Sequence, residues 1–253
     1  MRRDVLELRE FYAQPLGRAV RDLLSRKVGE KWGDAAGLDV LGLGYATPFL
    51  DRFAAARRVV AAMPAAQGVE TWPSGARNRA CLVEDAALPF QNALFDRILI
   101  VHGLEESETS AALLCEAGRV LAPSGRIIVI AAARGGLWSH AVKTPFGHGR
   151  PFTRGQLETL VREADLEPVA WSQALYVPPW TPLMRWADGF EQVGSRVWPG
   201  SAGLVLLEAV KRTFALRAKP VRAKLANPLP GVLAPQPTPA PAGMTHRRLR
   251  SRR

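Results

Sequence analysis

The chain has 253 residues, 47% of them hydrophobic, with a formal net charge of +11 at pH 7 and two cysteines. This length accommodates one large domain, or one domain and a tail, with a substantial buried core. No uninterrupted apolar run reaches about 18 residues, and residues 1–12 carry acidic side chains where a signal peptide needs an apolar run, so we expect no transmembrane segment and a cytoplasmic location.

The excess of positive over negative charge is confined to the last segment of the chain. Residues 1–210 contain 23 Lys and Arg and 23 Asp and Glu, whereas residues 211–253 contain 11 basic residues and no acidic one. The folded part is therefore electrically balanced, and the charge does not by itself indicate a nucleic-acid-binding fold.

The two cysteines exclude a disulfide framework and a zinc knuckle, because Cys81 and Cys115 lie far apart and form no CxxC pair. We expect each of them to be a small buried apolar residue.

The N-terminal segment, residues 1–35, is predicted to be helical. Apolar residues recur at helical spacing from Asp4 to Trp32, and Pro15 and Gly17 divide the pattern into two helices.

Strands and helices then alternate, which predicts a parallel sheet covered by helices on both faces. The expected strands are residues 38–41, 58–62, 80–85, 95–105, 125–133, 168–176 and 203–214, and the expected helices are residues 48–56, 108–121 and 154–166. Thr153 is a plausible N-cap of the last of these helices, and a long glycine- and aromatic-rich loop precedes it.

From residue 218 the sequence is rich in proline and alanine, basic, and nearly free of aromatic residues. Such a segment buries too little apolar area to offset its ordering entropy. We expect residues 1–217 to form the domain and residues 218–253 to form a disordered basic tail, either merely solvated or tethering the protein to nucleic acid or another anionic surface.

A glycine turn follows the first expected strand, in the sequence "LDVLGLGYATPFL". A strand that ends in glycines and leads into a helix is typical of a nucleotide-binding loop. A dinucleotide fold requires G-x-G-x-x-G, and Thr47 occupies the third glycine position, so that alternative is weak.

Three motifs in order, "LDVLGLGYATPFL", "VEDAALPFQNALFDRILIVHGLEE" and "EAGRVLAPSGRIIVIAAA", together resemble those of class I S-adenosylmethionine-dependent methyltransferases of the type 11 kind, over residues 36–132. The stretches "FYAQPLGRAVRDLL" and "TPFGHGRPFTRGQL" also resemble a bacterial subgroup of unknown acceptor. The resemblance implies a Rossmann-like, doubly wound seven-stranded sheet, mostly parallel with the last strand antiparallel.

The resemblance also implies a cofactor, S-adenosyl-L-methionine, and the positions that would contact it. Gly42 and Gly44 would pass under its methionine half, and Glu84 would accept a hydrogen bond from the adenine amino group. The implied cofactor positions are Gly42, Leu43, Gly44, Tyr45, Met63, Glu84, Asp85, Val101 and His102.

Met63 departs from the family pattern, which usually has an acidic residue at the end of the second strand to bind both ribose hydroxyls. Losing charge-assisted bonds to this diol costs about 1.5–3 kcal/mol each. Gln67 is the nearest polar alternative and Glu70 the nearest acidic one downstream.

Methyl transfer requires a donor and an acceptor held close together, and a neutral acceptor may need a base. Histidine titrates in the useful range, so His102 and His148 are the candidate catalytic residues. The candidate acceptor-binding residues are Arg134, Trp138, His140, Phe146 and Arg150. No motif for a metal site occurs, so none is expected. Asp96 is expected to be structural.

Two classes of function stay open. One is an active methyltransferase with an unidentified acceptor. The other is a degenerate methyltransferase fold that serves as a binding or regulatory module, its basic tail docking on nucleic acid or a protein partner. The glycine turn and Glu84 favour the first class, and Met63 favours the second.

Overall fold

The computed structural model describes residues 2–212, so the tail expected at residues 218–253 lies outside the described part. The helices are α1 (Val5–Ala13), α2 (Pro15–Trp32), α3 (Thr47–Leu50), α4 (Ser110–Val120), α5 (Arg154–Glu163) and α6 (Ala187–Val197). Short 3₁₀ helices are η1 (Asp51–Phe53), η2 (Leu137–His140), η3 (Pro145–Gly147), η4 (Thr181–Trp186) and η5 (Pro199–Ser201). The strands are β1 (Asp39–Gly44), β2 (Arg58–Pro64), β3 (Ala80–Val83), β4 (Phe95–Val101), β5 (Leu121–Ala132), β6 (Leu166–Ala174) and β7 (Leu204–Lys211).

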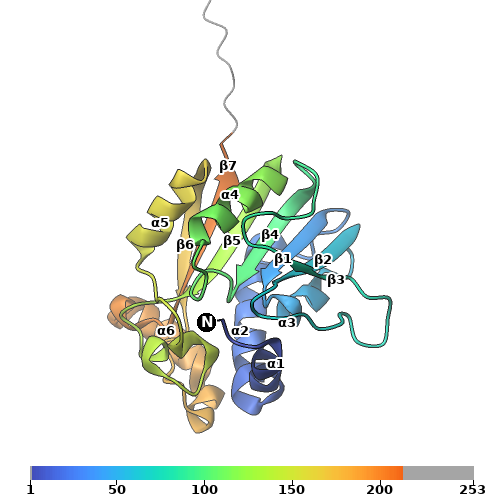
Figure 1. Cartoon of the computed structure of the whole chain (residues 1–253). Helices are drawn as coiled ribbons and strands as arrows, with labels where there is room; N and C mark the ends of the chain where they lie inside the picture. The colour runs from blue at the N-terminus through green and yellow to red at the C-terminus, as the bar shows by residue number, and fades with distance from the viewer. Residues whose placement is uncertain (1, 213–253) are drawn as a thin grey trace, which may run out of the picture. The chain divides into compact units, whose positions relative to one another are not determined.

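The seven strands form one sheet in the order β3-β2-β1-β4-β5-β7-β6 (Figure 1). Strands β1 to β5 are parallel, and β7 runs antiparallel to both of its neighbours. This is the Rossmann-like, mostly parallel sheet expected from the sequence. Because β1 and β4 are neighbours while β2 and β3 lie beyond β1, the strand order reverses between β1 and β4.

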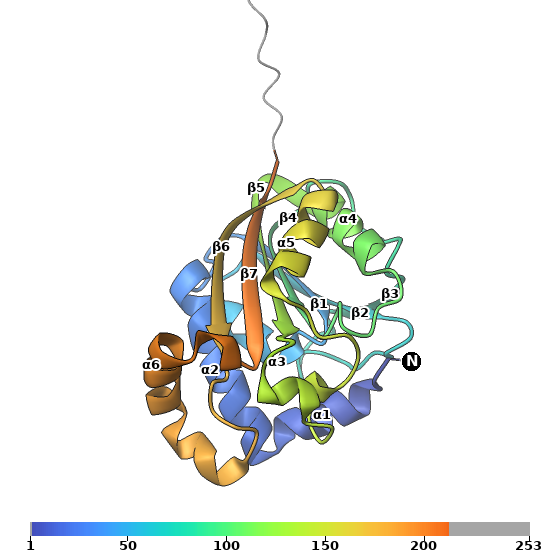
Figure 2. The same cartoon turned by 90° about the vertical axis from the view of Figure 1, so that its left-hand side faces the viewer.

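Helices cover both faces of the sheet, as Figures 1 and 2 show. Val40 and Leu99 point toward the layer of α1, α2 and α3, whereas Leu41 and Ile98 point toward the layer of α4 and α5. β1 is buried along its whole length, as expected for a central parallel strand whose two faces are both covered.

The N-terminal helices are separated where the sequence predicted. The Asp4 carboxylate caps α1 by accepting a hydrogen bond from the Leu6 N–H at 2.7 Å, and Pro15 occupies the first turn of α2, where its missing N–H costs nothing. A Cβ at Gly17 would lie only 2.0 Å from the Phe11 carbonyl oxygen, so glycine permits the sharp approach of the two helices.

Some local expectations differ from the structure. The helix expected at residues 48–56 is a single turn of α-helix followed by η1. We expected both cysteines to be buried, and this expectation is wrong. Cys81 is only half-buried, and Cys115, on α4, is exposed. Asp96 accepts a hydrogen bond from the Asp39 N–H at 2.9 Å across the start of β1, a structural contact. No helix in residues 2–212 is long and apolar enough to cross a membrane.

Candidate functional site

The candidate site lies where β1, β2 and β4 end. Parallel strands place their carboxyl ends at one edge of the sheet, and ligands of doubly wound folds bind at this edge, where the strand order reverses. Here Gly44, Pro64 and Val101 are the last residues of the three strands. We call the space above them the cleft.

Gly44 allows β1 to approach the loop after β4. Its φ is +79°, and a Cβ at this position would lie 2.2 Å from the Val101 carbonyl oxygen. Tyr45 continues the approach, because its N–H donates to the same oxygen at 2.8 Å. Gly42, by contrast, makes room for the side chains of Ala46 and Leu50 on the helix side, and Leu43 is buried in the core beneath α4.

The end of β2 carries no charge. The Met63 side chain is apolar and fully buried, so it offers a ligand no charged or polar group. Gln67 follows in the next turn, where its side chain is 3% exposed and its Nε2 has no hydrogen-bond partner. Glu70 is directed elsewhere and accepts from the Thr47 hydroxyl at 3.0 Å. Gln67 is thus the polar side chain that lines the cleft beside Met63.

The turn after β3 borders an open cavity of about 360 Å³, lined by Pro64, Ala65, Glu84, Asp85 and Ala86 among others. Glu84 is exposed in this cavity. Asp85 Oδ2 accepts from the Ser107 hydroxyl at 2.6 Å, whereas Oδ1 is buried without a partner.

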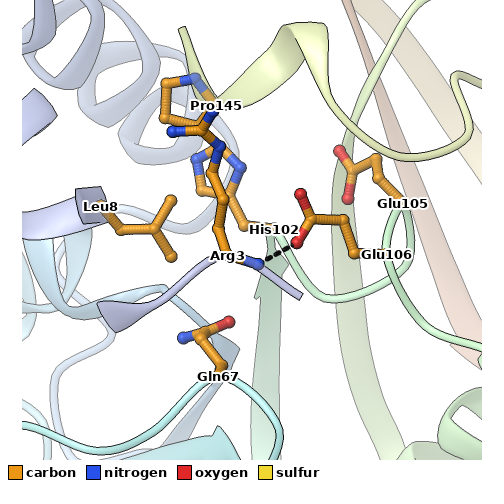
Figure 3. Close-up of a pocket in the computed structure, with 7 residues that line it drawn as sticks. All are labelled: Arg3, Leu8, Gln67, His102, Glu105, Glu106 and Pro145. Atoms are coloured by element: carbon orange, nitrogen blue, oxygen red, sulfur yellow. Dashed lines mark hydrogen bonds between the residues drawn. The ribbon is translucent and has the colours of Figure 1, made fainter. Parts of the chain in front are cut away.

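The N-terminal residues 2–12, which we call the N-terminal strap, lie across the cleft. The Arg2 guanidinium pairs with Asp85 and donates to the Gly103 carbonyl oxygen at 3.1 Å. The Arg3 N–H donates to the Glu106 carboxylate, as drawn in Figure 3. The Val5 N–H donates to the Gln67 carbonyl oxygen at 2.9 Å. These contacts bind the strap to the turns after β2, β3 and β4.

The strap leaves little space at the centre of the cleft. The cavity between Arg3, Leu8, Gln67, His102 and Glu105 has a volume of about 10 Å³, which is room for one water molecule. Figure 3 shows the Arg3 side chain in front of the His102 ring, with Gln67 below them.

His102 is held by the strap rather than left free. Its φ is +51°, its Nε2 lies 2.8 Å from the Tyr12 hydroxyl, and its ring packs against Phe146 at 4.7 Å between centroids. Burial, together with the nearby Arg3 cation, lowers the pKa of His102 to about 3. Burial raises the pKa of the Tyr12 hydroxyl well above its usual value, so this hydrogen bond joins two neutral groups.

Glu105 is the residue that our reading of the sequence missed. Its carboxyl group is buried, Oε1 accepts from the Ala132 N–H at 3.0 Å, and Oε2 has no partner. Burial, with a smaller contribution from the neighbouring Glu106, raises the pKa of this group to about 7. Figure 3 shows both carboxyl groups directed toward the space beside Arg3. No local signal in the sequence marks it, because the expected fourth strand, residues 95–105, ended on this residue.

The residues expected to bind an acceptor are not gathered in one place. Trp138 is fully buried and donates from Nε1 to the Val177 carbonyl oxygen at 2.7 Å, and Phe146 is buried against it. Both rings therefore belong to the core. The exposed members are Arg134, His140 and Arg150, of which Arg150 lies with its guanidinium 5.0 Å from the Phe152 ring centroid.

His148 contacts the N-terminal strap. Its Nε2 contacts the Arg3 guanidinium and is 2.7 Å from the Val142 carbonyl oxygen, so the strap reaches the long loop before α5 as well. Within residues 2–212, no group of three or more His, Cys, Asp or Glu side chains could hold a metal ion.

Residues 38–129 match the family model described as "Methyltransferase domain". The matched segment contains the glycine turn, the ends of β2 and β3, and the loop after β4, which together surround the cleft. No curated protein sequence matches the chain.

Solved structures share the fold at low sequence identity. A SAM-dependent methyltransferase from Thermotoga maritima is 18% identical, with a TM-score of 0.56 over 82% of this chain and 96% of its own. An S-adenosylmethionine-dependent methyltransferase from Mesorhizobium loti is 12% identical, with a TM-score of 0.52 over 74% of this chain and 96% of its own. The [4+2]-cyclase SpnF is 20% identical, with a TM-score of 0.52 over 75% of this chain and 81% of its own. The cyclase illustrates that this fold is not confined to one reaction.

Proposed function

We propose that this chain, a member of the class I S-adenosylmethionine-dependent methyltransferase family by its residues 38–129 and its fold, transfers a methyl group to an acceptor brought to the cleft. The observation that carries the proposal is that three elements of the matched segment lie together at the carboxyl-terminal edge of the parallel strands. They are the glycine turn at Gly44, the acidic turn at Glu84 and Asp85, and the loop after β4.

The residues present fit the family's cofactor, S-adenosyl-L-methionine, at its adenine end. The cavity of about 360 Å³ beside Glu84 and Asp85 is open there. The unpartnered Gln67 Nε2 would donate to a ribose hydroxyl in place of the acidic residue that Met63 replaces. At the methionine end, residues 2–8 of the strap fill the cleft and must withdraw to make room.

When bound, the cofactor supplies a methyl group on a positively charged sulfur. For a neutral acceptor, the chain must also remove a proton, and we assign this step to Glu105. Its pKa of about 7 makes it half ionised near neutral pH, and its free Oε2 borders the cleft.

His102 is a less suitable base, because a ring with a pKa of about 3 is neutral but weakly basic. Its Nε2 is also engaged by the Tyr12 hydroxyl. We assign to His102 a positioning role, in which it holds the Tyr12 side chain in place. Tyr12 stacks on Tyr45, with 5.8 Å between the ring centroids, and keeps water from the cleft. His148, which contacts Arg3, remains a candidate for acceptor contact once the strap moves.

The test is calorimetric titration with S-adenosylhomocysteine of the wild type, of Arg2→Ala, and of Arg21→Ala as a control on the exposed face of α2. Arg2 is buried in this ion pair and Asp85 is partly exposed. A charged hydrogen bond of this kind contributes about 1.5–3 kcal/mol. Its loss frees the strap, so we expect the affinity of Arg2→Ala to rise about tenfold to a hundredfold. Arg21→Ala should bind like the wild type.

A second candidate function is a binding module without methyl transfer. The observation in its favour is the N-terminal strap, which leaves only about 10 Å³ where the methionine half would lie. The same titration separates the two. If neither the wild type nor Arg2→Ala binds S-adenosylhomocysteine or S-adenosylmethionine up to millimolar concentration, although both are folded by circular dichroism, the binding module is the better description.

We also propose a cellular location and a class of partner. The free thiols of Cys81 and Cys115 are compatible with a cytoplasmic location. The basic tail would contact nucleic acid or another anionic surface, a partner suggested by its eight cations and its lack of acidic residues.

A further inference from the structure

The connection from β6 to β7 carries an exposed apolar surface. Three of its tryptophans are between 59% and 67% exposed, and three further large apolar side chains lie between them in the sequence. We call this set the aromatic face: Trp180, Trp186, Phe190, Val193, Val197 and Trp198. Single exposed apolar residues are ordinary, but a contiguous set marks an interaction surface.

The spacing of these residues places most of them on one side of α6. Trp186, Phe190, Val193 and Val197 recur at intervals of four, three and four, which is one stripe of a helix. The stripe borders a hollow of about 550 Å³ whose walls also include Tyr176 and Leu183. An apolar stripe normally faces the core, whereas this one faces outward.

Other positions of α6 hold the helix to the fold. A Cβ at Gly194, at the margin of the hollow, would lie 2.6 Å from the Tyr176 side chain, so α6 packs closely there. Asp188 pairs with Arg26 at 2.6 Å and Glu191 pairs with Lys27 at 3.1 Å, both on α2. Figure 2 shows α6 beside α2 at the margin of the molecule.

These ion pairs determine which charged side chains stay unpaired next to the aromatic face. Both acidic residues of α6 are neutralised by α2, whereas Arg185 and Arg196 have no carboxylate partner within residues 2–212. The Arg185 guanidinium lies 5.6 Å from the Trp186 ring centroid. The surface therefore combines indole rings with unpaired cations. Neither carboxylate of α6 is left unpaired to repel an anionic partner.

We propose that the aromatic face docks on an anionic lipid bilayer, with its tryptophans at the headgroup level. Tryptophan is enriched at this level because its ring is apolar and its N–H is polar. Stable attachment takes two signals, such as an apolar face and a polybasic segment. The second signal is present in the sequence, since residues 213–253 contain nine basic residues and no acidic one. A second copy of the chain would need the apolar stripe but would give no reason for this excess of cations.

The position of the aromatic face in the fold agrees with such docking. β6 runs parallel to β5 because both are antiparallel to β7, so the connection after Ala174 lies at the same edge of the sheet as the cleft. β7 returns to the opposite edge, but the 42 residues that follow Lys211 have a fully extended reach of roughly 140 Å. Both signals can therefore reach one membrane.

The test is flotation of the full-length protein with vesicles of phosphatidylcholine alone and with vesicles of equimolar phosphatidylcholine and phosphatidylglycerol. We expect binding to the anionic vesicles and at least tenfold less to the neutral ones. The variant Trp186→Ser/Trp198→Ser should lose at least tenfold in partitioning. The matched control is Trp171→Ser, because Trp171 is an exposed tryptophan on β6 that lies against Arg154 instead.

A second measurement needs no variant. Emission of the wild-type tryptophans should be quenched by vesicles that contain brominated phosphatidylcholine with phosphatidylglycerol. Absence of binding to anionic vesicles, or equal binding by the double tryptophan variant, would overturn the proposal. A dimer in sedimentation velocity that dissociates in Trp186→Ser/Trp198→Ser would assign the face to a second copy instead. Complete displacement from vesicles by RNA, with unchanged partitioning of the tryptophan variant, would assign binding to the tail alone.

Discussion

Substitution of Glu105 by glutamine tests the assignment of a buried, unpaired carboxyl group to the cleft. The carboxyl group titrates at 4.5 when exposed and at about 7 in the folded protein, because burial penalises its ionised form. A raised folded pKa means that the stability linked to this group is fully present below pH 4.5 and is lost as the pH rises through about 7. Glu105→Gln keeps an acceptor for the Ala132 N–H and removes the ionisation.

The expected size follows from the two pKa values. Each unit of difference corresponds to about 1.4 kcal/mol, so Glu105→Gln should be about 3 kcal/mol more stable than the wild type at pH 8 and nearly equal to it at pH 4.5. Urea unfolding at both pH values measures this difference, with Glu163→Gln on the exposed side of α5 as the control. A difference that is the same at both pH values would refute the reasoning, because ionisation of Glu105 would then have no cost.

Gly44→Ala should destabilise the fold by at least about 2 kcal/mol, because it adds both a positive-φ penalty and a contact 2.2 Å from the Val101 oxygen; thermal unfolding that matches the wild type would contradict this. The His102 ring should stay neutral from pH 8 down to about pH 4, since its folded pKa is about 3, and NMR titration of its ring protons checks the prediction. Arg57 holds the pKa of Asp39 below its usual value, so Arg57→Ala should lower stability at pH 7 and converge with the wild type in acid, as followed by unfolding between pH 7 and pH 2.

Most of the sheet could be predicted from the sequence. Strands such as β4 and β5 are continuous apolar runs followed or preceded by turn residues, and buried parallel strands require this pattern. The antiparallel β7 was expected only through the family resemblance, since strand direction leaves no mark on its composition. The short α3 was overestimated because the apolar periodicity of residues 48–56 fits either one helix or a turn of helix followed by a 3₁₀ turn.

The turns that border the candidate site could be predicted from the sequence, but the residues that fill its centre could not. Gly44 was predicted from the local glycine turn and Glu84 through the family resemblance, and their cofactor contacts stay predictions. The strap was not identified, because the contact of Arg2 with Asp85 spans 83 positions of the chain and no local pattern encodes it. Glu105 was overlooked for the same reason, since its raised pKa arises from burial that only the tertiary structure creates.

The burial of Arg2 against Asp85 and Gly103 has a practical consequence for work with this protein. An affinity tag fused ahead of Met1 would begin one residue from a guanidinium packed into the wall of the cleft. Such a tag would change the affinity that a ligand titration measures, even though it lies outside every element of the fold. A tag at this end should therefore be cleaved without scar residues before any binding experiment.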